Sequence, residues 1–139
     1  MIILAVDYGA RRIGLAVSDA LGIAAHGLPT LERKDPDSDI AAIVKTAGER
    51  KADLILVGLP LNMDDTEGPQ ARQAREFAGR LASASAIPVE LTDERLSSYE
   101  ATEALKEMGV KASDWRRYVD QLAAKMILTR YLERTNRNA

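Results

Sequence analysis

Two short apolar runs at the start of the chain predict a pair of strands joined by a tight turn. Residues 1–6 are all apolar, and the run stops at Asp7, which precedes a turn signal at residues 8–9. Over residues 13–17, large apolar side chains alternate with small ones. A continuous apolar run before a turn indicates a buried strand, and alternation indicates a strand with one covered face. The chain therefore opens with a predicted hairpin.

A third extended segment is expected over residues 23–31, after a turn at residues 19–22. Gly27 and Pro29 interrupt this segment. Because proline cannot donate a backbone hydrogen bond, its presence favours a strand at the edge of a sheet. Three consecutive strands with short turns form an antiparallel meander.

After residue 33 the apolar spacing becomes helical, with short apolar runs in between. The expected segments are a helix over 40–47, a strand over 54–57, a loop over 58–69, a helix over 71–81, a strand over 88–91, a helix over 97–109 and a helix from 113 to about 132. Strands that alternate with helices pair in parallel through crossovers. The predicted fold class is α/β, with three antiparallel strands, then two parallel strands, and helices on both faces of the five-stranded sheet.

Cap residues are expected at the helix ends: Asp37 or Ser38 for the first helix, a Ser97–Glu100 capping box for the third, Gly109 after it, and Ser113 for the last. The tail after Leu132 is expected to fray. A length of 139 residues predicts a single domain over residues 1–139.

Composition narrows the metal chemistry that is available to the chain. There is no cysteine and only one histidine, His26, which excludes a thiolate site and a multi-histidine zinc site within one chain. A metal site would therefore be built from carboxylates, which favours Mg²⁺ or Mn²⁺. We expect His26 to be a loop or strand residue without a catalytic role.

The formal net charge of −2 gives no overall signature of nucleic-acid binding. The arginines are nevertheless clustered, at residues 11–12, 72–80, 116–117 and 130–137. Such clusters are either solvated helix faces or a local basic patch. The apolar run at residues 1–6 is too short to span a membrane and has no basic segment before it, so a cytoplasmic protein is expected.

Three acidic residues stand at unusual positions in the predicted elements. Asp7 ends a buried strand, Glu94 follows the last strand, and Asp120 lies inside the final helix among apolar residues. Each has a simple structural alternative. Asp7 can be a turn residue, Glu94 can pair with Arg95 or face water, and Asp120 can pair with an arginine at residues 116–117.

Ligand sites in α/β sheets lie beyond the carboxyl ends of the strands, where Asp7 and Glu94 are both expected. Converging carboxylates bind divalent cations, and two cations about 3.5–4 Å apart can catalyse phosphoryl displacement. A site for such cations, built from Asp7, Glu94 and Asp120, is the hypothesis that these positions favour.

Four segments resemble the YqgF family, also called RuvX or the pre-16S rRNA nuclease family. They are DYGARRIGLAVSD (7–19), VGLPLNMDDTEG (57–68), LTDERLSSYEA (91–101) and DQLAAKMILTRYLE (120–133). The four segments occur in the order found in the family and extend over nearly the whole chain. The family has an RNase H-like fold and is related to Holliday junction resolvases of the RuvC type, which agrees with the order of elements above.

Six residues match functional positions of this family. By this resemblance, the catalytic residues and metal ligands are Asp7, Glu94 and Asp120, and the substrate-binding residues are Arg12, Asn62 and Arg95. For Arg95, an internal ion pair with Asp93 or Glu94 is the alternative. One position departs from the family: Asp65 stands where a glycine is usual, so we expect an aspartate in a turn that needs positive φ, at a cost relative to glycine.

The resemblance implies a metal-dependent endonuclease that hydrolyses phosphodiester bonds and processes the 5′ end of pre-16S ribosomal RNA in ribosome biogenesis. The implied cofactor is Mg²⁺ or Mn²⁺. The implied partners are nucleic acid, either precursor rRNA or branched DNA, and ribosomal particles, with no membrane; the protein would be a monomer or homodimer.

Three other functions are consistent with parts of the sequence. The first is a Holliday junction resolvase, and the second is a non-catalytic nucleic-acid or ribosome-assembly module that retains the acids. The third is an ATP-binding protein of the sugar-kinase or actin type, because its first phosphate loop resembles an Asp-x-Gly turn before a hairpin. That third fold needs a second glycine-rich phosphate motif, which the chain lacks.

Overall fold

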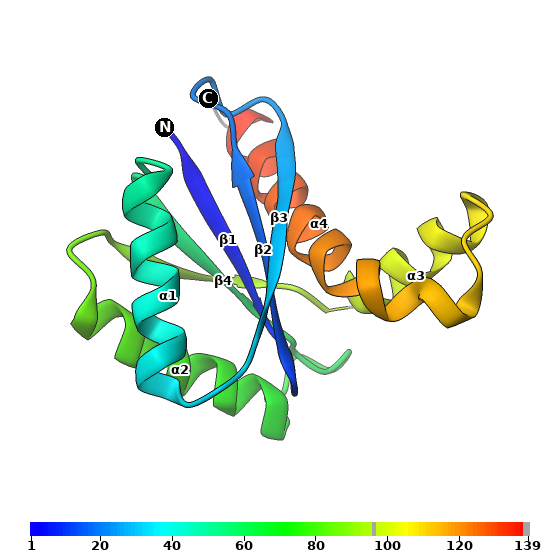
Figure 1. Cartoon of the computed structure of the whole chain (residues 1–139), viewed down its shortest axis with the longest axis horizontal. Coiled ribbons are helices and arrows are strands. Elements are labelled where there is room, and N and C mark those ends of the chain that lie inside the picture. Colours follow the sequence, from blue (N-terminus) through cyan, green and yellow to red (C-terminus); the bar gives the residue numbers. More distant parts are fainter. Residues whose placement is uncertain (96, 138–139) are drawn as a thin grey trace.

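A mixed five-stranded sheet forms the centre of the molecule, and helices cover both of its faces (Figure 1). The structure, a computed structural model, describes residues 1–95 and 97–137, without the side chains of residues 97–99, 116–117 and 137. The elements are β1 (Ile3–Tyr8), β2 (Arg12–Ser18), β3 (Ala25–Glu32), α1 (Pro36–Glu49), β4 (Leu54–Leu59), α2 (Pro69–Ala84), β5 (Val89–Asp93), α3 (Ser97–Glu107), a short 3₁₀ helix η1 (Ala112–Asp114) and α4 (Trp115–Arg137).

The strand order in the sheet is β3-β2-β1-β4-β5. β2 pairs antiparallel with both β1 and β3, whereas β4 pairs parallel with both β1 and β5. The predicted fold class is therefore confirmed, and β3, which carries Pro29, lies at an edge as expected. Because β1, β4 and β5 run in parallel, their carboxyl ends meet at one end of the sheet.

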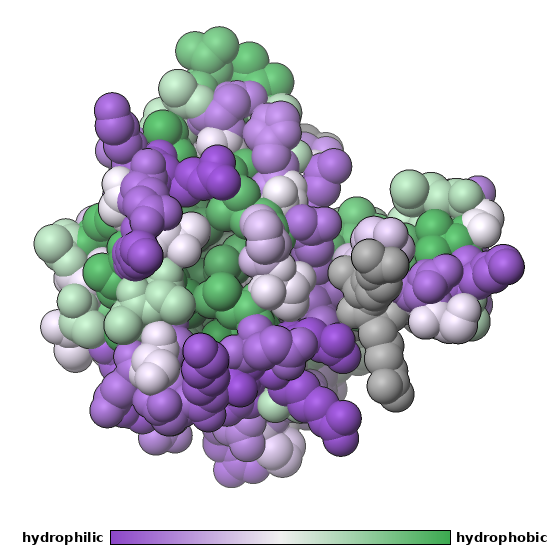
Figure 2. Space-filling model, in the orientation of Figure 1, coloured by the Kyte–Doolittle hydropathy of each residue, from purple (hydrophilic) through white to green (hydrophobic). Residues whose placement is uncertain are grey.

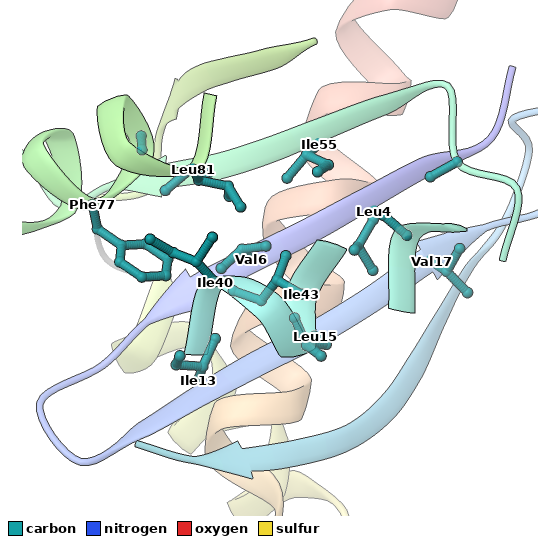
Figure 3. Packing of buried hydrophobic residues seen from close by; sticks show 14 of the residues in the cluster. Leu4, Val6, Ile13, Leu15, Val17, Ile40, Ile43, Ile55, Phe77 and Leu81 are labelled. Carbon is teal, nitrogen blue, oxygen red and sulfur yellow. The ribbon is translucent and has the colours of Figure 1, made fainter. Parts of the chain in front are cut away.

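Helices α1 and α2 cover one face of the sheet. Figure 3 shows Ile40 and Ile43 of α1 and Phe77 and Leu81 of α2 packed over strand residues such as Val6. Ile43 and Leu81 are fully buried. The buried side of α2 consists of the residues that its apolar spacing predicts: Ala71, Ala74, Phe77, Ala78 and Leu81.

Helix α4 covers the other face and lies unusually close to it. Ala123 and Ala124 are buried there, and their small side chains permit this approach. At Gly14 of β2, a Cβ atom would lie 2.1 Å from the backbone carbonyl oxygen of Asp120. The close approach fixes the position of the first half of α4, which carries Asp120.

Helix α3 packs on α4 and projects with it from the sheet as an arm (Figure 1). Apolar surface gathers on this arm, where Met108 is 72% exposed, and over the β2–β3 turn, where Leu21 is 81% exposed (Figure 2). None of the helices in the described part of the chain combines the length and the apolar character needed to cross a membrane.

The predicted N-cap of the first helix is wrong. The cap is Asp35, whose side chain accepts a hydrogen bond from the backbone N–H of Ser38 at 2.9 Å. Pro36 takes the first helical position, where its missing N–H costs nothing, so Asp37 and Ser38 belong to the first turn.

The predicted ends of the last helix are also wrong. Ser113 lies in η1, and α4 begins at Trp115. The helix continues to Arg137 because its last turns are anchored: Leu132 is buried, and the side-chain amide of Asn136 donates to the carbonyl oxygen of Gly22 at 3.5 Å.

At α3, the expected glycine is present after the helix, because Gly109 has a φ of +78° just beyond its end at Glu107. The Ser97–Glu100 capping box depends on a side chain outside the described residues.

Candidate active site

The carboxyl ends of β1 and β5 bring two acids into contact. Asp7 is the penultimate residue of β1, Glu94 follows β5 directly, and each is only 7% exposed. Their side chains are hydrogen-bonded to each other. Two carboxyl groups can form this bond only when one of them carries a proton. The structure thus places Asp7 and Glu94 at one end of the sheet, as the predicted strand order requires.

Burial raises the pKa of both acids. The pKa of Asp7 rises to about 6, chiefly because burial penalises its charged form, while the hydrogen bond from Glu94 acts in the opposite direction. Burial and the nearby charge of Asp7 raise the pKa of Glu94 to about 9. Near neutral pH, the pair as a whole is therefore expected to hold one proton between its two carboxyl groups.

Gly58 provides the space that the Glu94 side chain occupies. A Cβ atom at this position would lie 2.7 Å from Cδ of Glu94 and 2.8 Å from Cδ1 of Ile127. The backbone N–H of Glu94 also donates to the carbonyl oxygen of Leu59 at 3.0 Å, which continues the pairing of β5 with β4. The sequence placed Gly58 at the end of a strand, but nothing in it revealed this steric role.

Asp120 reaches the same region from α4, where it forms an ion pair with Arg12. Oδ2 of Asp120 lies 3.4 Å from Nε of Arg12, and the two side chains are 22% and 28% exposed. Burial raises the pKa of Asp120, and the Arg12 charge opposes this shift. The charge of Asp120 in turn raises the pKa of Asp7. The arginines at residues 116–117, which the sequence offered as alternative partners of Asp120, have side chains that the structure does not describe.

The three acids do not form a ready cation cage. Among the residues whose side chains are described, no group of three acidic or histidine side chains is placed to hold a metal ion. The donor set nevertheless fits a hard divalent cation, because it consists only of carboxylates. Asp7 and Glu94 are buried in contact with each other, and the charge of Asp120 acts on Asp7. A bound cation would offset the cost of burying these carboxylates in their charged form.

Arg95, next to Glu94, is held by two carboxylates. Its Nε lies 2.8 Å from Oδ2 of Asp93, and its backbone N–H donates to the same side chain. Its Nη2 pairs with Oδ1 of Asp65, and Nη1 donates to the carbonyl oxygen of Met63 at 3.3 Å. The ion pair between Arg95 and Asp93, which the sequence offered as an alternative role for Arg95, is therefore present. The second partner, Asp65, was not predicted.

The loop between β4 and α2 contains both Asp65 and Asn62. Asp65 has a φ of +70°, so the predicted turn with positive φ is confirmed. The side-chain amide of Asn62 donates to Oγ1 of Thr66 at 2.9 Å, and the backbone N–H of Asn62 donates to the carbonyl of the same residue. In this structure Asn62 shapes the loop that carries the partner of Arg95.

Arg33 is a further residue of the region that the sequence did not indicate. Its Nη1 donates to the carbonyl oxygens of Gly9 and Ala10, at 3.0 and 2.9 Å, and its guanidinium lies 4.3 Å from the ring centre of Tyr8. These contacts fix the β1–β2 turn, which presents Arg12. His26, by contrast, is an exposed residue of β3.

Comparison with known sequences gives a match over nearly the whole chain. The model of the family described as "RuvX: Holliday junction resolvase" matches residues 1–134. A protein of Anaeromyxobacter dehalogenans named "Putative pre-16S rRNA nuclease" is 50% identical over 131 residues, which cover 94% of this chain and 96% of that protein. A protein of the same name from Chloroflexus aurantiacus is 44% identical over 137 residues, covering 99% and 90%.

Solved structures share the fold at low sequence identity. RuvC of T. thermophilus, in complex with a Holliday junction substrate, aligns with a TM-score of 0.61 at 16% identity and covers 100% of this chain and 98% of its own. The fowlpox virus resolvase, in complex with Holliday junction DNA, aligns with a TM-score of 0.57 at 13% identity, covering 97% and 99%. The expected RNase H-like architecture is therefore confirmed.

Proposed function

The chain belongs to the RuvX family, and from this membership we propose that it is a metal-dependent nuclease whose active centre consists of Asp7, Glu94 and Asp120. A nuclease is a hydrolase that acts on phosphodiester bonds, in agreement with the name of the relatives. The observation that carries the proposal is the contact of two buried acids, Asp7 and Glu94, at the end of the sheet, where burial raises the pKa of both. Acid pairs with raised pKa values are typical of functional sites.

Asp7, Glu94 and Asp120 would hold the cation, Mg²⁺ or Mn²⁺, which when bound supplies an activated water and stabilises the leaving oxygen. Besides the cation, the side chains of Arg12 and Arg95 would supply positive charge for binding the substrate phosphate. Each is now paired with a carboxylate and only partly buried, so a phosphate can replace Asp120 at Arg12 and Asp65 at Arg95. Guanidinium groups bind phosphate oxygens through paired N–H donors, which orients the phosphodiester.

The proposed substrate is the 5′ end of precursor 16S rRNA, on its own or within a ribosomal particle. The support is the name that the relatives share at 44–50% identity over almost their full length. A DNA resolvase is the second candidate function. It is favoured by the description of the family whose model matches residues 1–134.

Cleavage of two substrates by the purified chain tests the proposal. One substrate is an RNA fragment that spans the 5′ end of 16S rRNA and its leader, and the other is a four-way DNA junction. We expect the RNA to be cut with Mg²⁺ or Mn²⁺ present, and not in EDTA or by Asp7→Asn. The control is Asp53→Asn, an acid that accepts a hydrogen bond from the backbone of Ile2 at the opposite end of the sheet and should retain full activity.

Each result assigns a function. Faster cutting of the junction than of the RNA would assign the protein to resolvases. Intact binding of RNA without cleavage of either substrate in any metal would identify a non-catalytic binding module and contradict the proposal.

A further inference from the structure

A cavity of about 250 Å³ opens beside the acid pair, between the end of β5 and the second half of α4. Its lining consists of five charged residues: Asp93, Arg95, Arg130, Glu133 and Arg134. Asp93 and Arg95 are the immediate neighbours of Glu94 in the chain. The cavity is therefore adjacent to the proposed active centre, yet Arg130 and Arg134 have no part in the chemistry described above.

The arginines of α4 bind residues on both sides of Glu94, one through a side-chain hydroxyl and one through a backbone carbonyl. Nη2 of Arg134 donates to Oγ1 of the buried Thr92 at 2.5 Å, and Nη1 of Arg130 donates to the carbonyl oxygen of Arg95 at 3.3 Å. Arginines four residues apart lie on one side of a helix, one turn from each other. Arg134 is thus positioned by a bond to β5, and Arg130 by a bond to the residue that follows Glu94.

Arg134 differs from the other two arginines in having no carboxylate partner. Arg95 pairs with Asp93 and Asp65, and Arg130 pairs with Glu100. Arg134 forms no ion pair with any side chain in the described ranges. A guanidinium has five N–H donors, and the bond to Thr92 uses one, so the remaining donors of Arg134 are available to a ligand.

The anion-binding capacity of the lining comes from Arg134. The other two arginines of the lining are already paired with carboxylates, Arg95 with Asp93 and Asp65, and Arg130 with Glu100. Phosphate is the anion that the forked N–H donors of arginine fit best in geometry and charge. A nucleic-acid strand carries phosphates at regular spacing, so a strand bound at the acid pair brings further phosphates to the surfaces beside it.

We propose that this cavity is a second phosphate site, at which Arg134, supported by Arg130, binds the backbone of the nucleic-acid strand next to the phosphodiester that is cut. The inference rests on the proposed function, because it takes nucleic acid as the ligand. It deepens that function by giving the strand a direction, from the acid pair along β5 and the second half of α4.

The salt dependence of binding tests the site. A fluorescein-labelled single-stranded RNA is titrated with the full chain in EDTA, at salt concentrations from about 50 to about 200 mM. Each neutralised phosphate of a single strand contributes about 0.7 to the slope of log affinity against log salt. We expect Arg134→Gln to reduce the slope by about that amount and to weaken binding equally for RNAs of different sequence. Arg134→Lys, which keeps the charge, should retain most of the slope.

The matched control is Arg50→Gln, an exposed arginine at the end of α1 that forms no ion pair with a described side chain and should leave the slope unchanged. An unchanged slope in Arg134→Gln, or equal losses in both variants, would overturn the site. Thermal unfolding of every variant shows whether a loss of RNA affinity arises from misfolding. If Arg134→Gln is misfolded, the salt slope of Arg134→Lys alone decides whether the site exists. Failure of the wild-type chain to bind RNA at any salt concentration would instead overturn the nucleic-acid ligand itself.

Discussion

Asp7 and Glu94 form a pair whose ionisation opposes folding. The pKa of each acid in the folded chain lies above its ordinary value, 3.8 for Asp7 and 4.5 for Glu94. Between those values and the folded ones, about 6 and about 9, the folded chain binds more protons than the unfolded chain. The contribution of the pair to stability is therefore complete at low pH and is lost as the pH rises through the folded pKa values.

We predict that, in EDTA, the free energy of unfolding of the wild type falls relative to that of Glu94→Gln between about pH 5 and about pH 9. Urea unfolding followed by circular dichroism measures both proteins across this range. Subtracting the unfolding free energy of Glu94→Gln from that of the wild type at each pH removes the contributions of the acids that both proteins share. A difference that stays constant or grows in favour of the wild type as pH rises would show that the pair is not buried with a shared proton.

If Arg95 binds a phosphate of the substrate as proposed, Asp65 competes with that phosphate for Arg95. When RNA binds, a phosphate should take the place of the Asp65 carboxylate at Arg95. The ion pair between Arg95 and Asp65 that is lost in this exchange is worth at most about 1 kcal/mol. We predict that Asp65→Asn binds RNA about two- to fivefold more tightly than the wild type, as measured by fluorescence anisotropy. Asp65→Gly should share this gain and also be more stable, since glycine adopts a φ of +70° without strain.

The role of Arg95 in this effect can be isolated with a second substitution. In an Arg95→Gln background the gain from Asp65→Asn should disappear. If the gain persists there, Asp65 acts only through its general repulsion of nucleic acid.

Among the elements, the contact between α4 and the sheet determines where Asp120 lies in the proposed active centre. Gly14 permits this contact: a Cβ atom there would be 2.1 Å from the Asp120 carbonyl oxygen, and backbone atoms cannot move aside without displacing the helix. Gly58 acts in the same way for the Glu94 side chain, where β4 meets the residue after β5. Two glycines in separate strands thus set the positions of two of the three acids.

Gly14→Ala should lower the free energy of unfolding by about 1–3 kcal/mol or more, because overpacking against backbone displaces α4. Gly79→Ala in α2 is the control, since nothing lies within 4 Å of its added Cβ atom and alanine favours a helix. It should stabilise the protein by about 0.5–1 kcal/mol. Denaturant unfolding compares the two. Equal stability of Gly14→Ala and the wild type would contradict the close packing of α4.

At the scale of the molecule, the fold and the meeting of Asp7 with Glu94 could be predicted because both follow from strand order. An apolar run that ends in an acid places that acid at the end of a strand, and parallel pairing then brings such ends together. The predictions that concern helix ends were less accurate, because Pro36 and the anchored last turns of α4 override the local cap signals.

Contacts between side chains that are distant in the chain could not be predicted. Arg95 and Asp65 are 30 residues apart, and Arg134 and Thr92 are 42 residues apart. Sequence spacing contains no information on which arginine faces which acid once α4 has packed across the sheet. For this reason the sequence grouped residues 130–137 only as a cluster of charge. The structure separates Arg130, which is paired with Glu100, from Arg134, which has no carboxylate partner among the described side chains.

In the proposed active centre, a divalent cation takes the place of the proton that Asp7 and Glu94 are expected to hold between them. Calorimetric titration with Mn²⁺ near pH 7, in two buffers of different ionisation enthalpy, measures both binding and proton release. We expect binding to the wild type to release about one proton per chain, and Asp7→Asn and Glu94→Gln to bind Mn²⁺ weakly and release none. Equal Mn²⁺ affinity in all three proteins, or binding to the wild type without proton release, would contradict it.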